Sequence, residues 1–332
     1  MQSILDKWIT INDIQINQTE FPPIFYLEWY NNRNRPYKDS QAKFISKLPE
    51  HTFYKKVKWD NHYIFTVGKF STFEPHIFHN FTFINVPVLK SNLQKCIRRR
   101  LTIEALRTAY CLMANDFQSF IRRLPILMIE DVILNKCFST LIWMMIAYPK
   151  WKPATCHVEW LLGVVHFLTT CNKADIPCKS KIISNNTNYL DSIYSLQIRK
   201  SFGGLSGDIT MINKYIITWN NRFIKNNIPI EFFQKIKIIN LESLHEFNKN
   251  DIQISAIDFH CYKIMITWIY DKFPNYEEED IKKAIWFGSS GFNIRHKKNI
   301  LYTCDSFYKQ IWNEIKYEVI KTAKYLIYKL EE

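Results

Sequence analysis

Three residues with side chains suited to catalysis stand close together in the segment AIDFHCYK, namely Asp258, His260 and Cys261. An Asp–His pair can transfer protons, and a cysteine beside a histidine can serve as a nucleophile. Neighbouring side chains on a helix diverge by about 100°, so closeness in the sequence does not establish this geometry. The other interpretation of these residues is structural, with Asp258 as the N-cap of a helix and Cys261 as a core residue. An enzyme centred on these residues, or on the glycine-containing segments SFGGLSGD and WFGSSGFN, is therefore one alternative function.

The residues best suited to bind phosphate form a basic cluster, KCIRRR, and its continuation along the chain. They are Lys95, Arg98, Arg99, Arg100, Arg107, Arg122 and Arg123. If the two helices that carry them are antiparallel neighbours, the guanidinium groups converge and can bind phosphate oxygens bidentately. Glu104, Glu130 and Asp131 lie nearby and could instead neutralise the arginines in structural ion pairs. Both interpretations are open at this point.

Glycine is concentrated in the stretch SFGGLSGD, which holds Gly203, Gly204 and Gly207. The spacing fits neither the P-loop pattern nor the dinucleotide fingerprint. GLSG does match the short GxxG of KH domains, where the backbone approaches phosphates. The stretch is a candidate anion-binding loop, and Arg199 and Lys200 just before it are further candidate nucleic-acid-binding residues. The alternative is a reversal between two amphipathic helices, with Gly203 or Gly204 in the left-handed conformation.

Four further residues, Cys156, His157, Cys171 and Cys178, are candidate zinc ligands, although the paired CxxC or HxxxH spacing of strong zinc sites is missing. The alternative is that these cysteines are scattered core residues. No metal or cofactor is expected. The eight cysteines form no dense framework. Reduced thiols in an intracellular compartment, either cytoplasm or nucleus, are therefore expected.

The composition is that of a basic globular protein. Of 332 residues, 47% are hydrophobic and 16% aromatic, and 44 Lys and Arg against 31 Asp and Glu give a net charge of +13. Such a chain can build a core, and its charge favours contact with polyanions.

Abundant Ile, Asn and Lys with scarce Gly are typical of an AT-rich genome. No signal peptide is recognised in MQSILDKWIT, and the longest apolar run, 137–148, is shorter than the roughly 20 residues of a membrane span, so no membrane partner is expected.

The elements that must position these residues change along the chain. Residues 1–90 contain short β-branched and aromatic runs, which predict a mixed, β-rich N-terminal subdomain with an extended Pro-containing arm. Apolar spacings near 3.6 predict a basic helical domain over 91–250 and a C-terminal helical subdomain over 251–332. The expected fold class is mainly α, an irregular multi-helical array of helix pairs with a smaller mixed α+β N-terminal subdomain.

The sequence therefore predicts a non-catalytic, nucleic-acid-associated accessory or assembly protein. Its basic helical face would neutralise the phosphate backbone of DNA or RNA without reading bases. A structural or scaffold protein of a larger protein assembly is the second hypothesis, and exposed aromatic patches with the arginines already paired would favour it.

Overall fold

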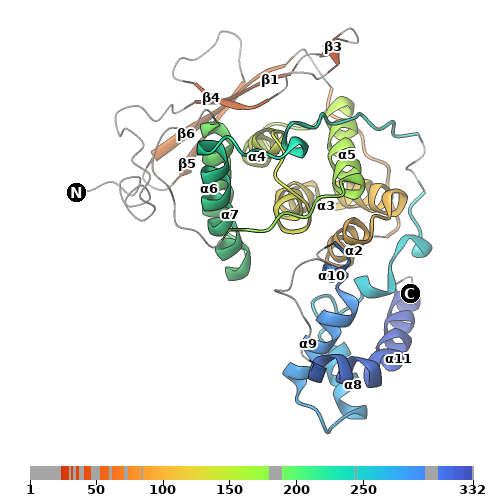
Figure 1. Ribbon diagram of the computed structural model, residues 1–332. Helices are drawn as coiled ribbons and strands as arrows, with labels where there is room; N and C mark the ends of the chain where they lie inside the picture. Colours follow the sequence, from red (N-terminus) through yellow and green to blue (C-terminus); the bar gives the residue numbers. More distant parts are fainter. Residues whose placement is uncertain are drawn as a thin grey trace. The chain divides into compact units, whose positions relative to one another are not determined.

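The computed structural model is mainly helical, with a small four-stranded mixed sheet near the N-terminus, which confirms the expected fold class (Figure 1). It describes residues 24–29, 31–32, 35–36, 41–45, 53–59, 62–70, 74–83, 85–178, 189–242, 244, 246–295 and 306–330. The chain divides into two compact units. Unit 1 consists of Met1–His76, Leu124–Val158 and Asp175–Ile236, and unit 2 of Ile77–Arg123, Glu159–Ala174 and Lys237–Glu332. Each unit thus combines three segments, whereas the sequence predicts three contiguous domains.

The sheet belongs to unit 1 and has the strand order β4-β1-β6-β5. Its strands are β1 (Ile24–Trp29), β4 (Lys43–Ile45), β5 (Phe53–Trp59) and β6 (His62–Phe70), and a separate ribbon joins β2 (Asn31–Asn32) to β3 (Arg35–Pro36). β1 runs parallel to β6 and antiparallel to β4. The sequence predicts β1 as part of an extended arm; it is extended, but it is a buried inner strand of the sheet. The part of that arm before residue 24 lies outside the described residues. The sequence also predicts a linker in the polar segment KSKIISNNTNY, of which residues 179–188 lie outside the described residues.

The helices of unit 1 are held to the sheet by α4 (Phe138–Ala147), whose residues are all buried, as expected for the apolar run. The indole of Trp143 donates to the carbonyl oxygens of Phe25 (2.9 Å) and Val67 (3.1 Å), in β1 and β6. The unit also contains α6 (Leu190–Ser201), α7 (Ser206–Ile224) and the 3-10 helix η1 (Ile230–Phe233). The pair α6 and α7 was expected from the sequence.

The first helix break of the chain differs from the prediction. The sequence predicts one helix over about 92–113, but α2 (Val86–Arg99) ends at Arg100 and α3 (Thr102–Asp131) follows. Arg100 adopts the left-handed conformation, with φ 62°. A residue other than glycine rarely does so, and the sequence therefore gives no signal of the break.

The segment before α2 also differs from the prediction, which treats 76–88 as strand-like. Described residues from 76 to 83 form no strand. Their aromatic side chains pack on α3 instead, with the rings of Phe78 and Phe81 6.0 and 5.7 Å from that of Tyr110. A run of aromatic residues can form a strand or pack as an irregular segment on a helix, and here it packs on α3.

The C-terminal part of unit 2 is a helical cluster around one apolar core (Figure 1). Its elements are η2 (Lys249–Asp251), η3 (Ile254–Ala256), α8 (Ile264–Lys272), α9 (Glu278–Ser289), α10 (Phe292–Arg295) and α11 (Ser306–Lys329), and α5 (Thr155–Thr170) lies partly in unit 2. On α11, Ile311, Ile315 and Val319 recur every four residues and are buried. The opposite face of α11 is consequently left to solvent.

Close packing of α9 on α11 generates the first testable prediction. A Cβ at Gly288 would overlap the indole of Trp312. Gly288→Ala is therefore expected to lower the free energy of unfolding by about 1–3 kcal/mol through overpacking. Denaturant unfolding measures it, with Gly207→Ala as the control, since a Cβ there meets no atom within 4 Å. Equal stability of the two variants would contradict the packing.

Candidate functional site

The cation at the start of the basic cluster is buried. Lys95 Nζ lies 3.3 Å from Oδ2 of Asp258, and both side chains are almost fully enclosed. Burial lowers the pKa of Lys95. Burial alone would raise the pKa of Asp258, but the hydrogen bond with His260 and the charge of Lys95 hold it below its ordinary value. The pair ties α2 to the turn that follows η3.

The triplet Asp258, His260 and Cys261 is brought together, but not as a nucleophilic site. Oδ1 of Asp258 accepts a hydrogen bond from the backbone N–H of His260 (2.9 Å). The same oxygen lies 3.3 Å from the ring atom Nδ1 of His260. The thiol of Cys261 donates to the carbonyl oxygens of Ala256 (3.4 Å) and Pro87 (3.6 Å). Burial raises the pKa of Cys261 to about 11, so it stays a thiol at neutral pH. Asp258 caps this turn, whereas the helix predicted to start near it begins at residue 264.

The next two arginines bind the C-terminal end of α9. Arg98 is 4% exposed, donates to the carbonyl oxygen of Ser290 (3.3 Å), and its guanidinium lies 5.2 Å from the ring centre of Phe292. Arg99 donates to the carbonyl oxygen of Ser289 (2.7 Å). Cations are favourable at a helix C-terminus, where the last carbonyl groups lack helical partners. These two side chains therefore stabilise the fold of unit 2.

Three of the remaining candidate arginines also donate within unit 2. Their bonds join Arg100 to Asn172 (2.6 Å), Arg107 to Asp251 (3.3 Å) and Arg123 to Gln94 (2.6 Å). Arg122 is half-buried, and Arg100 is exposed. Each such bond leaves fewer donors for a phosphate group. Phosphate contact by these residues stays a prediction.

The glycine-rich stretch forms a reversal between α6 and α7. Gly203 and Gly204 have φ values of +76° and +152°, which favour glycine. The buried Arg199 donates to the carbonyl oxygen of Gly203 (2.8 Å). The carboxylate of Asp208 lies over Gly204 and already places a negative charge in the first turn of α7. Anion binding by this loop stays a prediction.

Among the described residues, no three His, Cys, Asp or Glu side chains gather as a metal site. His157 accepts the backbone N–H of Ala154 (2.9 Å), and its ring packs on Trp29 and Trp151, with centroids 4.5 and 5.1 Å away. Burial lowers the pKa of His157 to about 3, so the ring is neutral. Of the three candidate cysteines, Cys156 lies beside His157, Cys178 accepts a hydrogen bond from the hydroxyl of Thr218 (3.4 Å), and Cys171 belongs to unit 2.

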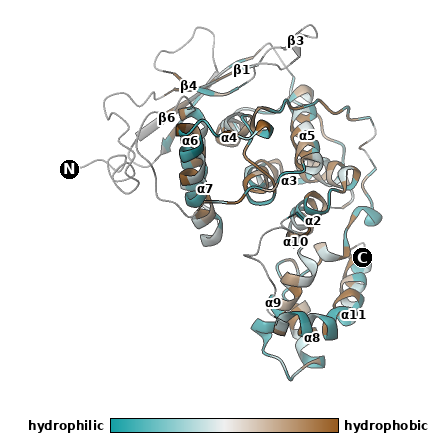
Figure 2. Cartoon of the chain, in the orientation of Figure 1, coloured by the Kyte–Doolittle hydropathy of each residue, from teal (hydrophilic) through white to brown (hydrophobic). Residues whose placement is uncertain are grey.

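The exposed face of α11 was not among the predicted sites. Tyr317, Lys321, Lys324 and Tyr328 recur at i, i+4, i+7 and i+11 and therefore lie along one side of the helix. All four are exposed, and we call them the α11 stripe. Figure 2 shows hydrophilic and hydrophobic residues alternating along this helix. The segment KYEVIKTAKYLIYK carries the signal for this face, which lies opposite the apolar spacing of the same helix.

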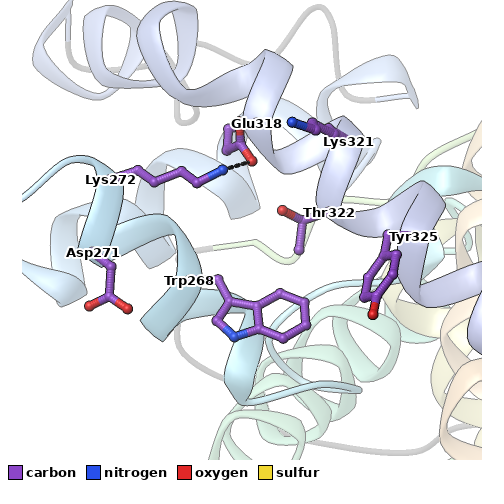
Figure 3. Close-up of a pocket in the computed structure, with 7 residues that line it drawn as sticks. All are labelled: Trp268, Asp271, Lys272, Glu318, Lys321, Thr322 and Tyr325. Atoms are coloured by element: carbon purple, nitrogen blue, oxygen red, sulfur yellow. Dashed lines mark hydrogen bonds and ion pairs between the residues drawn. The ribbon is translucent and has the colours of Figure 1, made fainter.

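A cleft of about 350 Å³ adjoins the α11 stripe, between α8 and α11 (Figure 3). It is lined by Trp268, Asp271, Lys272, Glu318, Lys321, Thr322 and Tyr325. The rings of Trp268 and Tyr325 have centroids 6.0 Å apart and a tilt of 51°. Lys272 and Glu318 form an ion pair across the cleft. The cleft thus combines two aromatic rings with one unpaired charge of each sign, from Asp271 and Lys321, as far as the described residues show.

Comparisons with protein-family models, with curated proteins and with solved structures found no match to this chain. In the described part of the chain, every helix is too short or too polar to cross a bilayer.

The buried ion pair generates the second prediction. Lys95→Met leaves Asp258 buried without its cation, and is expected to lower the free energy of unfolding by about 3–5 kcal/mol. Combining it with Asp258→Asn should cost less than the sum of the two single losses, because neither charge is then left alone. Denaturant unfolding of the four proteins measures this coupling, and Lys263→Met, at an exposed lysine, is the control. Strictly additive losses would show that the two groups do not interact.

The buried histidine generates the third prediction. The folded pKa of His157 is about 3, against 6.5 when exposed, so only the unfolded chain takes up this proton between those values. Its contribution to stability is complete above pH 6.5 and is lost as the pH falls towards 3. In His157→Gln this part of the pH dependence should be absent. Urea unfolding across the window measures it, and identical slopes in the two proteins would refute a buried neutral ring.

Proposed function

We propose that this chain is a non-catalytic, nucleic-acid-associated accessory protein that binds the phosphate backbone of DNA or RNA through the α11 stripe. The observation that carries the proposal is a pair of exposed lysines, flanked by two exposed tyrosines, along one side of α11. Lysine ammonium groups attract phosphates and displace their counterions, and aromatic rings add contact area to bases and sugars. The buried Lys95 and Arg98 are not part of this surface.

The charge around α11 supports this proposal. Glu318 is paired with Lys272, and Glu314 accepts a hydrogen bond from the hydroxyl of Tyr276 (2.6 Å). Within the described residues, Lys321 forms no ion pair, and neither does Lys324. The acidic residues on the same helix thus leave the lysine charges uncompensated. A net charge of +13 for the chain adds long-range attraction to any polyanion.

A scaffold protein is the second candidate, because the arginines of α2 are engaged within their unit while tyrosines are exposed on α11. Tyrosine is enriched in protein–protein interfaces, but lysine is depleted there. Two lysines stand side by side at the centre of the α11 stripe. Their charges favour a polyanionic partner over a protein partner.

Binding to generic DNA and RNA tests the proposed function and is the fourth prediction. Labelled oligonucleotides are titrated with the full chain in a salt series, and fluorescence anisotropy gives the dissociation constants. The double variant Lys321→Gln, Lys324→Gln removes two of the charges proposed to contact phosphates. It should reduce the slope of log K against log salt by about 1.4 to 1.8.

The matched control is Lys214→Gln with Lys225→Gln, which removes two exposed lysine charges from α7 and its C-cap. This pair should change the slope much less. No binding near physiological salt, or equal slopes for the two double variants, would remove the proposed function as placed on α11.

A further inference from the structure

We infer that the cleft between α8 and α11 holds one unpaired base of single-stranded nucleic acid, while the neighbouring phosphates contact Lys321 and Lys324. The inference rests on the proposed function and names its substrate class, since it requires single strands to bind better than duplexes. It also assigns a site, centred on Trp268 and Tyr325, that backbone binding alone does not need.

The size and shape of the cleft suit one base. Its volume of about 350 Å³ is at the small end of the range for small-molecule sites. Lys321 of the α11 stripe is one of the residues that line the cleft (Figure 3). A strand lying along the α11 stripe can therefore insert a base without leaving the lysines.

The aromatic walls supply the main attraction. Trp268 is half-buried and packs against the core of unit 2, which fixes its ring, and Tyr325 is 46% exposed. The two ring planes are tilted by 51°, so they form an angled wall rather than a closed stack. A base can lie against either ring, and every base has a face for such stacking. The site is therefore tolerant of sequence.

The charges of the cleft orient the strand. Asp271 is exposed at one end, one helical turn after Trp268, and its carboxylate repels phosphate. A carboxylate can accept hydrogen bonds from the amino groups of bases. Lys321 lies on α11, and Lys324 follows one turn later. The base therefore occupies the Trp268 side, and the phosphates occupy the lysine side.

A duplex cannot use this cleft. Its bases are stacked on each other and paired along their Watson–Crick edges, so neither surface reaches Trp268 without unstacking. A surface that bound only the backbone would show the opposite preference, because a duplex carries the higher charge density. The ratio of single-strand to duplex affinity therefore separates base insertion from plain charge attraction.

The test, and the fifth prediction, compares a labelled single strand of mixed sequence with its duplex by anisotropy. Trp268→Leu should weaken single-strand binding about ten-fold, the loss typical of one stacked base. Duplex binding should change by less than about two-fold. Trp268→Phe retains a ring and should keep most of the affinity. Trp286→Leu removes an exposed tryptophan of α9 outside the cleft and should have no effect.

Because Trp268 packs on the core, Tyr325→Leu provides a second variant at a more exposed ring, and thermal unfolding verifies that each variant is folded. Tyr325→Leu should also weaken single-strand binding selectively. Duplex binding as tight as single-strand binding, or unchanged affinity in both folded variants, would overturn the inference. If the lysine variants still reduce binding in that case, the proposed function stands alone. If neither nucleic acid binds, both are lost.

Discussion

Desolvated cations on one helix organise unit 2. Lys95 and Arg98 lie on α2 and are buried, so each needs a negative group or a set of carbonyl oxygens in place of water. Asp258 supplies a carboxylate to Lys95, and the end of α9 supplies a carbonyl oxygen to Arg98. α2 is thereby fixed to both the turn after η3 and the α8–α9–α11 cluster.

The same residue types consequently have two roles in this chain. Lys95 and Arg98 of α2 are held inside, whereas Lys321 and Lys324 of α11 are exposed to solvent. In the sequence the KCIRRR cluster is the denser of the two and is the stronger electrostatic signal. Its density reflects a helix that is surrounded by its own unit, and the sparser lysines of α11 remain available to a partner. Local charge density is therefore a poor guide to accessible charge.

Much of the fold could be predicted from the sequence, because an apolar run indicates α4, apolar spacing indicates α7 and α11, and turn residues delimit β5 and β6. The break at Arg100 could not, since only tertiary contacts hold a non-glycine residue in the left-handed conformation. The cleft could not be predicted either. Trp268 and Tyr325 lie on different helices, and their meeting depends on how α8 packs against α11. Exposure of the α11 stripe, by contrast, follows from the apolar face opposite it.

The two faces of α11 are linked through this packing. Ile315 and Val319 are buried in the core and set the rotation of the helix about its axis. That rotation places Lys321 and Tyr325 at the cleft and Tyr317 in solvent. Trp268 is held from the other side by the same core. A base entering the cleft would meet two aromatic rings already in position, so little ordering entropy would oppose its stacking. The rings thus differ from the lysines of the α11 stripe, whose long side chains would be ordered by each phosphate that they contact.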